Sequence, residues 1–95
     1  MTEALANNVV DNPDRRRFEL EENGALAVAD YRVQEGVMIL PHVEAAPVLR
    51  GTGAAGRLME GVFDAARRRG LKVAPLCPYA DAYIRRHPRH EDLRA

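Results

Sequence analysis

The chain has 95 residues, of which 46% are hydrophobic and 29% charged, and its 14 basic and 14 acidic side chains give a formal net charge of zero. This length accommodates one domain, residues 1–95, because a second independent core would need a longer chain. A net charge of zero argues against general nucleic-acid binding, which needs many uncompensated phosphate contacts. The single cysteine, Cys77, excludes an intrachain disulfide and a zinc site built from thiolates, so we expect no bound metal.

The sequence also lacks the signals of a membrane protein. No apolar run approaches the roughly 20 residues of a membrane span. The N-terminal stretch contains the acidic residue Glu3 and has no apolar centre of the kind found in signal peptides. We therefore expect a cytoplasmic protein that does not bind membranes. Residues 1–6 are expected to be flexible, and residues 89–95 to form a polar tail.

The first half of the chain predicts an antiparallel meander. Residues 15–21 alternate, with Phe18 and Leu20 on one face, which is typical of a half-buried strand. An Asn-Gly pair at residues 23–24 is the strongest short hairpin signal, and a second turn ends at Gly36. The strand between these turns is apolar on both faces and is expected to be central. The predicted strands are residues 7–11, 15–21, 25–33 and 37–44.

The second half predicts a helix, a short strand and another helix. The helix at residues 53–69 has an apolar stripe, carries three arginines in its last turn and ends at Gly70. Those arginines complement the helix dipole. A strand at residues 71–74 follows by a crossover that makes it parallel to the strand at 37–44, and Pro78 begins a helix that closes before Pro88. The predicted fold class is therefore α+β (α/β), a meander followed by a β-α-β-α unit.

Two local features leave more than one interpretation. Pro41 lies inside a predicted strand, where it marks either an edge strand or a point at which the sheet opens and leaves backbone groups free for a ligand. Residues 50–55, Arg-Gly-Thr-Gly-Ala-Ala, precede a helix whose first amides can bind an anion. The glycines there could equally serve only to turn the chain. The loop lacks the Gly-Lys-Ser/Thr ending of a nucleotide P-loop.

With this loop, the sequence resembles the GNAT-family N-acetyltransferases. Arg50, Gly53 and Ala55 match the R-x-x-G-x-A pattern of the acetyl-coenzyme A loop in that family. Further segments resemble its compact, single-domain subfamily, over roughly residues 18–93. These segments are His42-Val43-Glu44, Leu49–Gly53, Gly70–Val73, Cys77-Pro78-Tyr79-Ala80 and Tyr83–Pro88.

The resemblance implies a V-shaped opening between the strands at residues 37–44 and 71–74, with coenzyme A lying in it. The diphosphate would rest on the amides of residues 50–55, and the pantetheine would pair with the backbone near residues 42–45. Tyr79 and Tyr83 would pack over the cofactor or serve the core, and Arg85 would approach the 3′-phosphate or complement the helix dipole. The predicted cofactor-binding residues are Val43, Glu44, Ala45, Arg50, Gly51, Thr52, Gly53, Ala54, Ala55, Cys77, Tyr79, Tyr83 and Arg85.

Three side chains are candidates for catalysis. Cys77 lies before a helix N-terminus, where a thiol can be activated to carry an acyl group, but cysteine is also a common core residue. His42 and Glu44 share a face of their strand, so His42 could take a proton and Glu44 could orient it or act through water. The alternative is a polar outer face of the sheet.

These observations predict an acetyl-CoA-dependent N-acetyltransferase acting on an unidentified amine of a small molecule or peptide. The first alternative is a non-catalytic module that binds coenzyme A or acyl-CoA as a sensor or partner protein. A weaker alternative is a nucleic-acid adaptor that uses the arginines at residues 67–69 and 85–86, and the zero net charge argues against it.

Overall fold

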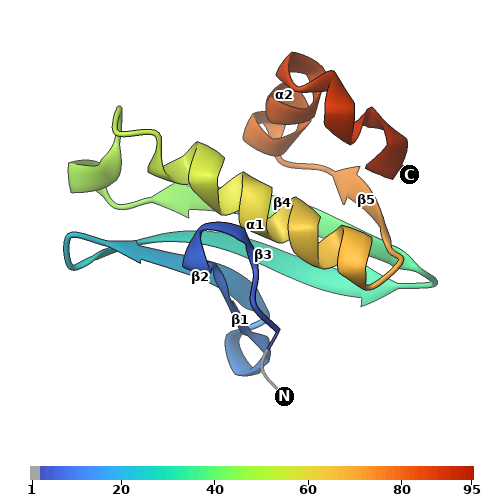
Figure 1. Ribbon diagram of the computed structural model, residues 1–95, viewed down its shortest axis with the longest axis horizontal. Coiled ribbons are helices and arrows are strands. Elements are labelled where there is room, and N and C mark those ends of the chain that lie inside the picture. Colours follow the sequence, from blue (N-terminus) through green and yellow to red (C-terminus); the bar gives the residue numbers. More distant parts are fainter. Residues whose placement is uncertain (1–2) are drawn as a thin grey trace.

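The computed structural model describes residues 3–95, which form a five-stranded sheet with the strand order β1-β2-β3-β4-β5. The first four strands form an antiparallel meander, and β5 pairs with β4 in parallel. Helix α1 joins β4 to β5, and α2 follows β5 (Figure 1). The predicted α+β fold class is confirmed. The elements are β1 (Val10–Asn12), β2 (Arg17–Glu22), β3 (Ala25–Gln34), β4 (Val37–Ala45), α1 (Ala54–Arg68), β5 (Lys72–Pro75) and α2 (Pro78–Arg86).

Two tight turns fix the register of the long strands. Asn23 and Gly24 have φ angles of 52° and 75°, and Glu35 and Gly36 have φ angles of 51° and 79°. Two consecutive residues with positive φ are typical of the type I′ turn, whose twist matches that of the strands it joins. The two hairpins are therefore as expected, and β3 lies at the centre of the sheet between β2 and β4.

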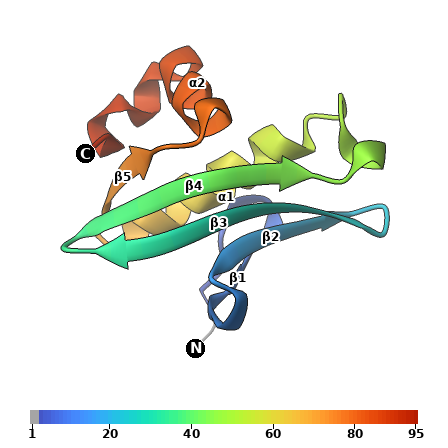
Figure 2. The same ribbon diagram turned by 180° about the vertical axis from the view of Figure 1, so that it is seen from behind.

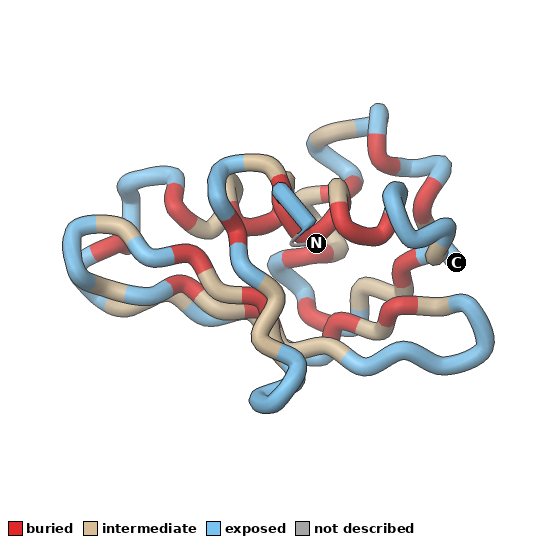
Figure 3. Tube along the Cα trace, turned by 60° about the horizontal axis from the view of Figure 1, so that its bottom comes forward, coloured by how far each residue is buried: buried red, intermediate tan, exposed pale blue. Residues whose placement is uncertain are grey.

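Helix α1 covers one face of the sheet with its apolar stripe. Leu58, Met59, Val62 and Phe63 of this stripe are fully buried, and the Phe63 ring also lies against His90 of the C-terminal segment. The opposite face carries no helix in the part of the chain that the structure describes, as the view from behind shows (Figure 2). Buried and less buried residues alternate along β2 and the first half of β3 (Figure 3), because successive side chains of a strand point to opposite faces. No helix within residues 3–95 is long and apolar enough to cross a membrane.

The N-terminal segment is held more firmly than expected. Residues 1–2 lie outside the described residues, but Leu5 is buried and the amide of Ala6 donates to the Asp64 carboxylate at 3.0 Å. The chain crosses α1 at Gly61, where an added Cβ would lie 2.3 Å from a Val9 methyl. The first strand starts at Val10 instead of residue 7, because residues 6–8 form a 3₁₀ turn.

The expectation of a polar C-terminal tail is wrong. Residues Pro88–Leu93 form a 3₁₀ helix that buries His90 and Leu93 against the domain. The amide of Ala95 donates to the carbonyl of Val73 at 2.8 Å, so the last residues lie along β5. The composition of this segment is polar, but Arg89, His90 and Asp92 have partners on α1, and Leu93 reaches the core.

Candidate functional site

Strands β4 and β5 separate halfway along β4. Their parallel pairing runs from Val37 opposite Lys72 to Leu40 opposite Pro75. The amide of Cys77 then donates to the carbonyl of Leu40 at 3.0 Å, and α2 leads the chain away from the sheet. Beyond this point β4 continues with β3 as its only strand neighbour among residues 3–95. The sheet is therefore open between β4 and α2, as the resemblance implied.

A bulge in β4 explains how Pro41 is accommodated. Asp30 pairs with His42 and Arg32 with Ile39, so Leu40 and Pro41 together lie opposite Tyr31 alone. The missing N–H of Pro41 falls where the ladder is already irregular. Of the two interpretations of Pro41, the structure supports the one in which the sheet opens.

The open edge of β4 presents backbone groups. The amide of Ala46 donates to the carbonyl of Leu26 at 2.9 Å, which identifies the hydrogen-bonded pairs of this ladder. Residues alternate along an antiparallel strand between facing the partner and facing away. His42 and Glu44 therefore direct their peptide groups to β3, and Val43 and Ala45 direct theirs to the open edge.

The loop before α1 presents further amides beside this edge. Gly51 and Gly53 have φ angles of 78° and 87°, a conformation that side chains rarely adopt. The Thr52 hydroxyl donates to the carbonyl of Leu49 at 2.5 Å and accepts from the amide of Ala54 at 3.3 Å.

Only part of the loop is available to a ligand. The amides of Arg50 and Thr52 donate to carbonyls of the preceding 3₁₀ turn, Pro47–Leu49. Among residues 3–95, no acceptor pairs with the amides of Gly51, Gly53, Ala55 and Gly56. The amides available to an anion are therefore those of Gly51, Gly53, Ala55 and Gly56, and not all the amides of residues 50–55 as expected.

Two adjoining grooves connect the strand edge to the helix N-terminus. The larger has a volume of about 420 Å³ and the smaller about 260 Å³. Ala45, Arg50, Ala55 and Tyr79 line both, so the two form one continuous site along β4, the loop and the first turn of α2. The remaining lining residues are His42, Val43 and Glu44 in the larger groove, and Leu49, Gly51, Gly53, Ala54 and Gly56 in the smaller.

The grooves bring together most, but not all, of the predicted cofactor-binding residues. Thr52 turns its hydroxyl into the loop, and Arg85 pairs with Asp81 at 2.9 Å on the exposed side of α2. Neither residue lines a groove, and the same holds for Cys77 and Tyr83. The predicted residues that do line the grooves are Val43, Glu44, Ala45, Arg50, Gly51, Gly53, Ala54, Ala55 and Tyr79.

His42 and Glu44 form an exposed pair at the larger groove. Nε2 of His42 lies 2.9 Å from Oε1 of Glu44, and the two side chains are 54% and 65% exposed. The hydrogen bond from His42 lowers the pKa of Glu44 below its ordinary value. The carboxylate therefore accepts, and the pair is available to an incoming ligand.

Cys77 lies where β4 and β5 separate, but its side chain belongs to the core. It is 7% exposed and precedes the first residue of α2. Its carbonyl accepts from the amide of Asp81 at 3.0 Å, so its backbone begins the helix. Cys77 is therefore close to the open edge in sequence, but its thiol is buried among apolar residues of the core.

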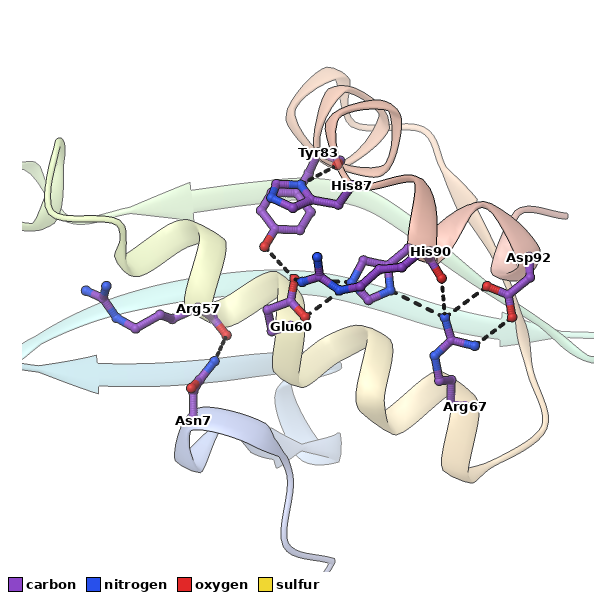
Figure 4. A network of polar contacts seen from close by, with 9 residues as sticks. Asn7, Arg57, Glu60, Arg67, Tyr83, His87, His90 and Asp92 are labelled. Atoms are coloured by element: carbon purple, nitrogen blue, oxygen red, sulfur yellow. Dashed lines mark hydrogen bonds and ion pairs between the residues drawn. The ribbon is translucent and has the colours of Figure 1, made fainter.

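A polar cluster that the sequence did not indicate lies between α1, α2 and the C-terminal segment (Figure 4). Glu60 of α1 accepts from the Tyr83 hydroxyl at 2.5 Å, from Arg89 at 2.6 Å and from His90 at 3.1 Å. Partial burial raises the pKa of Glu60, but these three donors outweigh it and lower the pKa to about 2. Burial and the bond to Glu60 raise the pKa of Tyr83.

The same cluster uses Arg67, which the sequence indicated as a complement to the helix dipole or, in a weaker alternative, as a contact for nucleic acid. Its guanidinium donates to Asp92 at 2.6 and 2.9 Å and to the carbonyl of Arg89 at 2.8 Å. The His87 ring stacks on Tyr83 with centroids 3.9 Å apart. Since the partners of Glu60 lie 23 to 30 residues away in the chain, no local pattern could have indicated them.

Among the described residues there is no group of three or more side chains that could hold a metal ion. A protein-family model described as GCN5-related N-acetyl-transferase matches residues 17–93 of the chain. The match begins at β2 and ends in the C-terminal 3₁₀ helix, so it contains all the groove-lining residues.

Proposed function

The chain belongs to the GCN5-related N-acetyltransferase family, and we propose that it binds acetyl-coenzyme A along β4 and transfers the acetyl group to an amine. The observation that carries this proposal is the open edge of β4 beside a helix N-terminus with available amides. A strand edge suits a ligand with its own amide groups, and a helix N-terminus suits a diphosphate. Coenzyme A has both features on one molecule.

The residues of the grooves fit these two parts of the cofactor. The peptide groups of Val43 and Ala45 would pair with the pantetheine amides. The amides of Gly53 and Ala55 would hold the diphosphate, with the exposed guanidinium of Arg50 nearby. When bound, acetyl-coenzyme A supplies an activated acetyl group.

His42 is the residue we assign to proton transfer. The Glu44 carboxylate accepts from Nε2, which leaves the lone pair on Nδ1 to take a proton from the acceptor amine. The same hydrogen bond to Glu44 holds the orientation of the ring. The remainder of the rate enhancement would come from orienting the reactants in the groove.

Two routes of acetyl transfer differ in whether the Cys77 thiol takes part. A direct route needs only the amine and the acetyl donor in the groove. A covalent route needs the Cys77 thiol to accept the acetyl group first. The direct route is favoured here because Cys77 lines neither groove. Full turnover by Cys77→Ala in an amine-acetylation assay would rule out the covalent route, and complete loss of turnover would support it.

Calorimetric titration with acetyl-coenzyme A tests the proposal directly. We expect saturable binding, weakened about tenfold by Arg50→Gln because a charge-assisted contact is lost. The matched control is Arg85→Gln, which removes an exposed arginine that lines neither groove. The absence of heat with millimolar cofactor would contradict the proposal, and an effect of Arg85→Gln alone would assign the phosphate contact to α2.

A second function, coenzyme A binding without turnover, is favoured by one observation. The side chains of His42 and Glu44 are 54% and 65% exposed, so the described residues do not enclose an acceptor amine around them. This alternative predicts cofactor binding with no release of the free thiol across a panel of small-molecule and peptide amines. Thiol release that depends on the amine would instead support the transferase.

A further inference from the structure

We propose that Arg57 and Glu22 form a positioning pair that directs the Gly53 amide toward the diphosphate site at the start of α1. This inference rests on the proposed function, because it assigns a role within the same coenzyme A site. Neither side chain lines a groove. Their effect on a ligand would therefore act through the loop.

The Arg57 guanidinium links the β2–β3 hairpin to the loop. Nε and Nη2 donate to the two carboxylate oxygens of Glu22 at 2.8 and 2.7 Å. Nη2 also donates to the carbonyl of Thr52 at 3.1 Å. A two-pronged arginine–carboxylate pair holds the guanidinium in one orientation. Arg57 thus links the Thr52 carbonyl to the β2–β3 hairpin through Glu22.

Fixing this carbonyl also fixes the amide that follows it. In a trans peptide bond, the Thr52 carbonyl and the Gly53 N–H point in opposite directions. The carbonyl accepts from Arg57, which lines neither groove, so the Gly53 N–H points away from Arg57, and Gly53 itself lines the smaller groove. Glycine accepts either sign of φ, so this peptide would turn over readily without the anchor.

The space around Gly53 agrees with this role. A Cβ at Gly53 would lie 2.9 Å from Nη1 of Arg57, so glycine leaves the room that the guanidinium occupies. Glycine at this position therefore serves the anchor as well as the turn.

One substitution distinguishes positioning by this pair from simple electrostatic attraction, because the two explanations predict opposite changes in affinity for coenzyme A. Glu22→Gln removes a negative charge and leaves the positive charge of Arg57 unbalanced. If Arg57 acted only by attracting the anionic cofactor, Glu22→Gln would tighten binding. If Arg57 acts by positioning the loop, Glu22→Gln weakens binding because the guanidinium is no longer held in place.

The experiment is calorimetric titration of coenzyme A into the wild type and three variants. We expect Arg57→Met to weaken binding about tenfold and Glu22→Gln about threefold. The matched control is Arg68→Gln on the same helix, whose partner is Asp64 and which lies away from the loop, and it should leave binding unchanged. Pantetheine, which lacks the diphosphate, should compete equally well in all four proteins.

Two results would overturn the inference. One is coenzyme A binding to Glu22→Gln that is as tight as, or tighter than, binding to the wild type. The other is an equal loss of pantetheine binding in Arg57→Met, which would indicate a general disturbance of the domain. If the wild type binds no coenzyme A, the proposed function fails, and NMR relaxation of the Gly53 amide in the free protein decides the positioning role. Increased mobility in Arg57→Met supports that role, and unchanged mobility overturns it.

Discussion

The groove beside β4 and the polar cluster around Glu60 use polar groups in opposite ways. In the groove, the available groups are mostly backbone amides and carbonyls, together with exposed side chains such as Arg50 and His42. In the cluster, charged side chains from three elements satisfy one another around Glu60 and Arg67. One region remains open to a partner, and the other has already made its bonds.

The difference shows why charged residues are poor guides to function on their own. Arg67, Arg89 and His90 are ionisable residues of the kind that often serve function, but here they hold the C-terminal segment on α1. The groups that are available to bind a ligand are mostly backbone peptide groups, and every sequence contains these. Their availability depends on where the sheet and the helix leave them without partners.

The largest expected effect on stability comes from removing the carboxylate at the centre of the polar cluster, that of Glu60. Glu60→Ala should lower the free energy of unfolding by roughly 3 kcal/mol, because it strands the partly buried donors of Tyr83 and His90. Glu60→Gln keeps an acceptor for these donors and should cost about half as much. Urea denaturation of both variants measures these losses of unfolding free energy. Two variants as stable as the wild type would show that the cluster contributes nothing.

Acidification should weaken the same cluster. The folded-state pKa of Glu60, about 2, lies below its ordinary value of 4.5. The stabilisation is therefore complete above pH 4.5 and is lost as the pH falls from about 4.5 to about 2. Over this range the wild type should lose roughly 1–2 kcal/mol more of its unfolding free energy than Glu60→Gln. Parallel pH curves for the two proteins would contradict the assignment.

Gly53→Ala should act on the groove with a smaller effect on stability. Alanine must adopt a φ of 87° or change it, and its Cβ would displace Arg57. We expect coenzyme A binding to weaken about tenfold and the unfolding free energy to fall by about 1 kcal/mol. Calorimetry and urea denaturation on one preparation separate the two effects. A loss of stability without a loss of affinity would contradict the assignment of this loop.

The smallest effect is expected at Gly56, which adjoins both regions. It lines the smaller groove, and an added Cβ would lie 3.3 Å from Cε2 of Tyr83. Gly56→Ala should gain helix propensity and lose a little at this contact, so stability should change by less than about 1 kcal/mol. Affinity for coenzyme A should change by less than about threefold, since the Gly56 amide is kept. A larger change in affinity would indicate that the orientation of Tyr83 influences the groove.

Local sequence predicted much of the fold because the relevant physics is local. The Asn-Gly pair at residues 23–24 adopts the positive φ angles of a tight hairpin turn. The apolar stripe of residues 54–68 forms α1, and the loop of Arg50 and Gly53 lies at its N-terminus as expected. The family match confirms the resemblance that these segments indicated. Each of these features depends on residues close together in the chain.

Long-range packing decided what local patterns left open. Whether Pro41 marked an edge or an opening depended on the bulge opposite Tyr31 and on where β5 stops pairing. The C-terminal residues read as a tail because their partner, Glu60, lies on a different helix.

The sequence by itself determined the meander, the amphipathic helix and the glycine loop, because turn conformation and hydrophobic periodicity depend on neighbouring residues. The tertiary structure alone decided which polar groups remain available. Arg50 lines the grooves and Arg67 is bound to Asp92, although both are arginines beside an end of α1. The physical reason is that a hydrogen-bonding group is free or satisfied according to what the fold brings within about 3 Å of it, and the order of residues does not specify that distance.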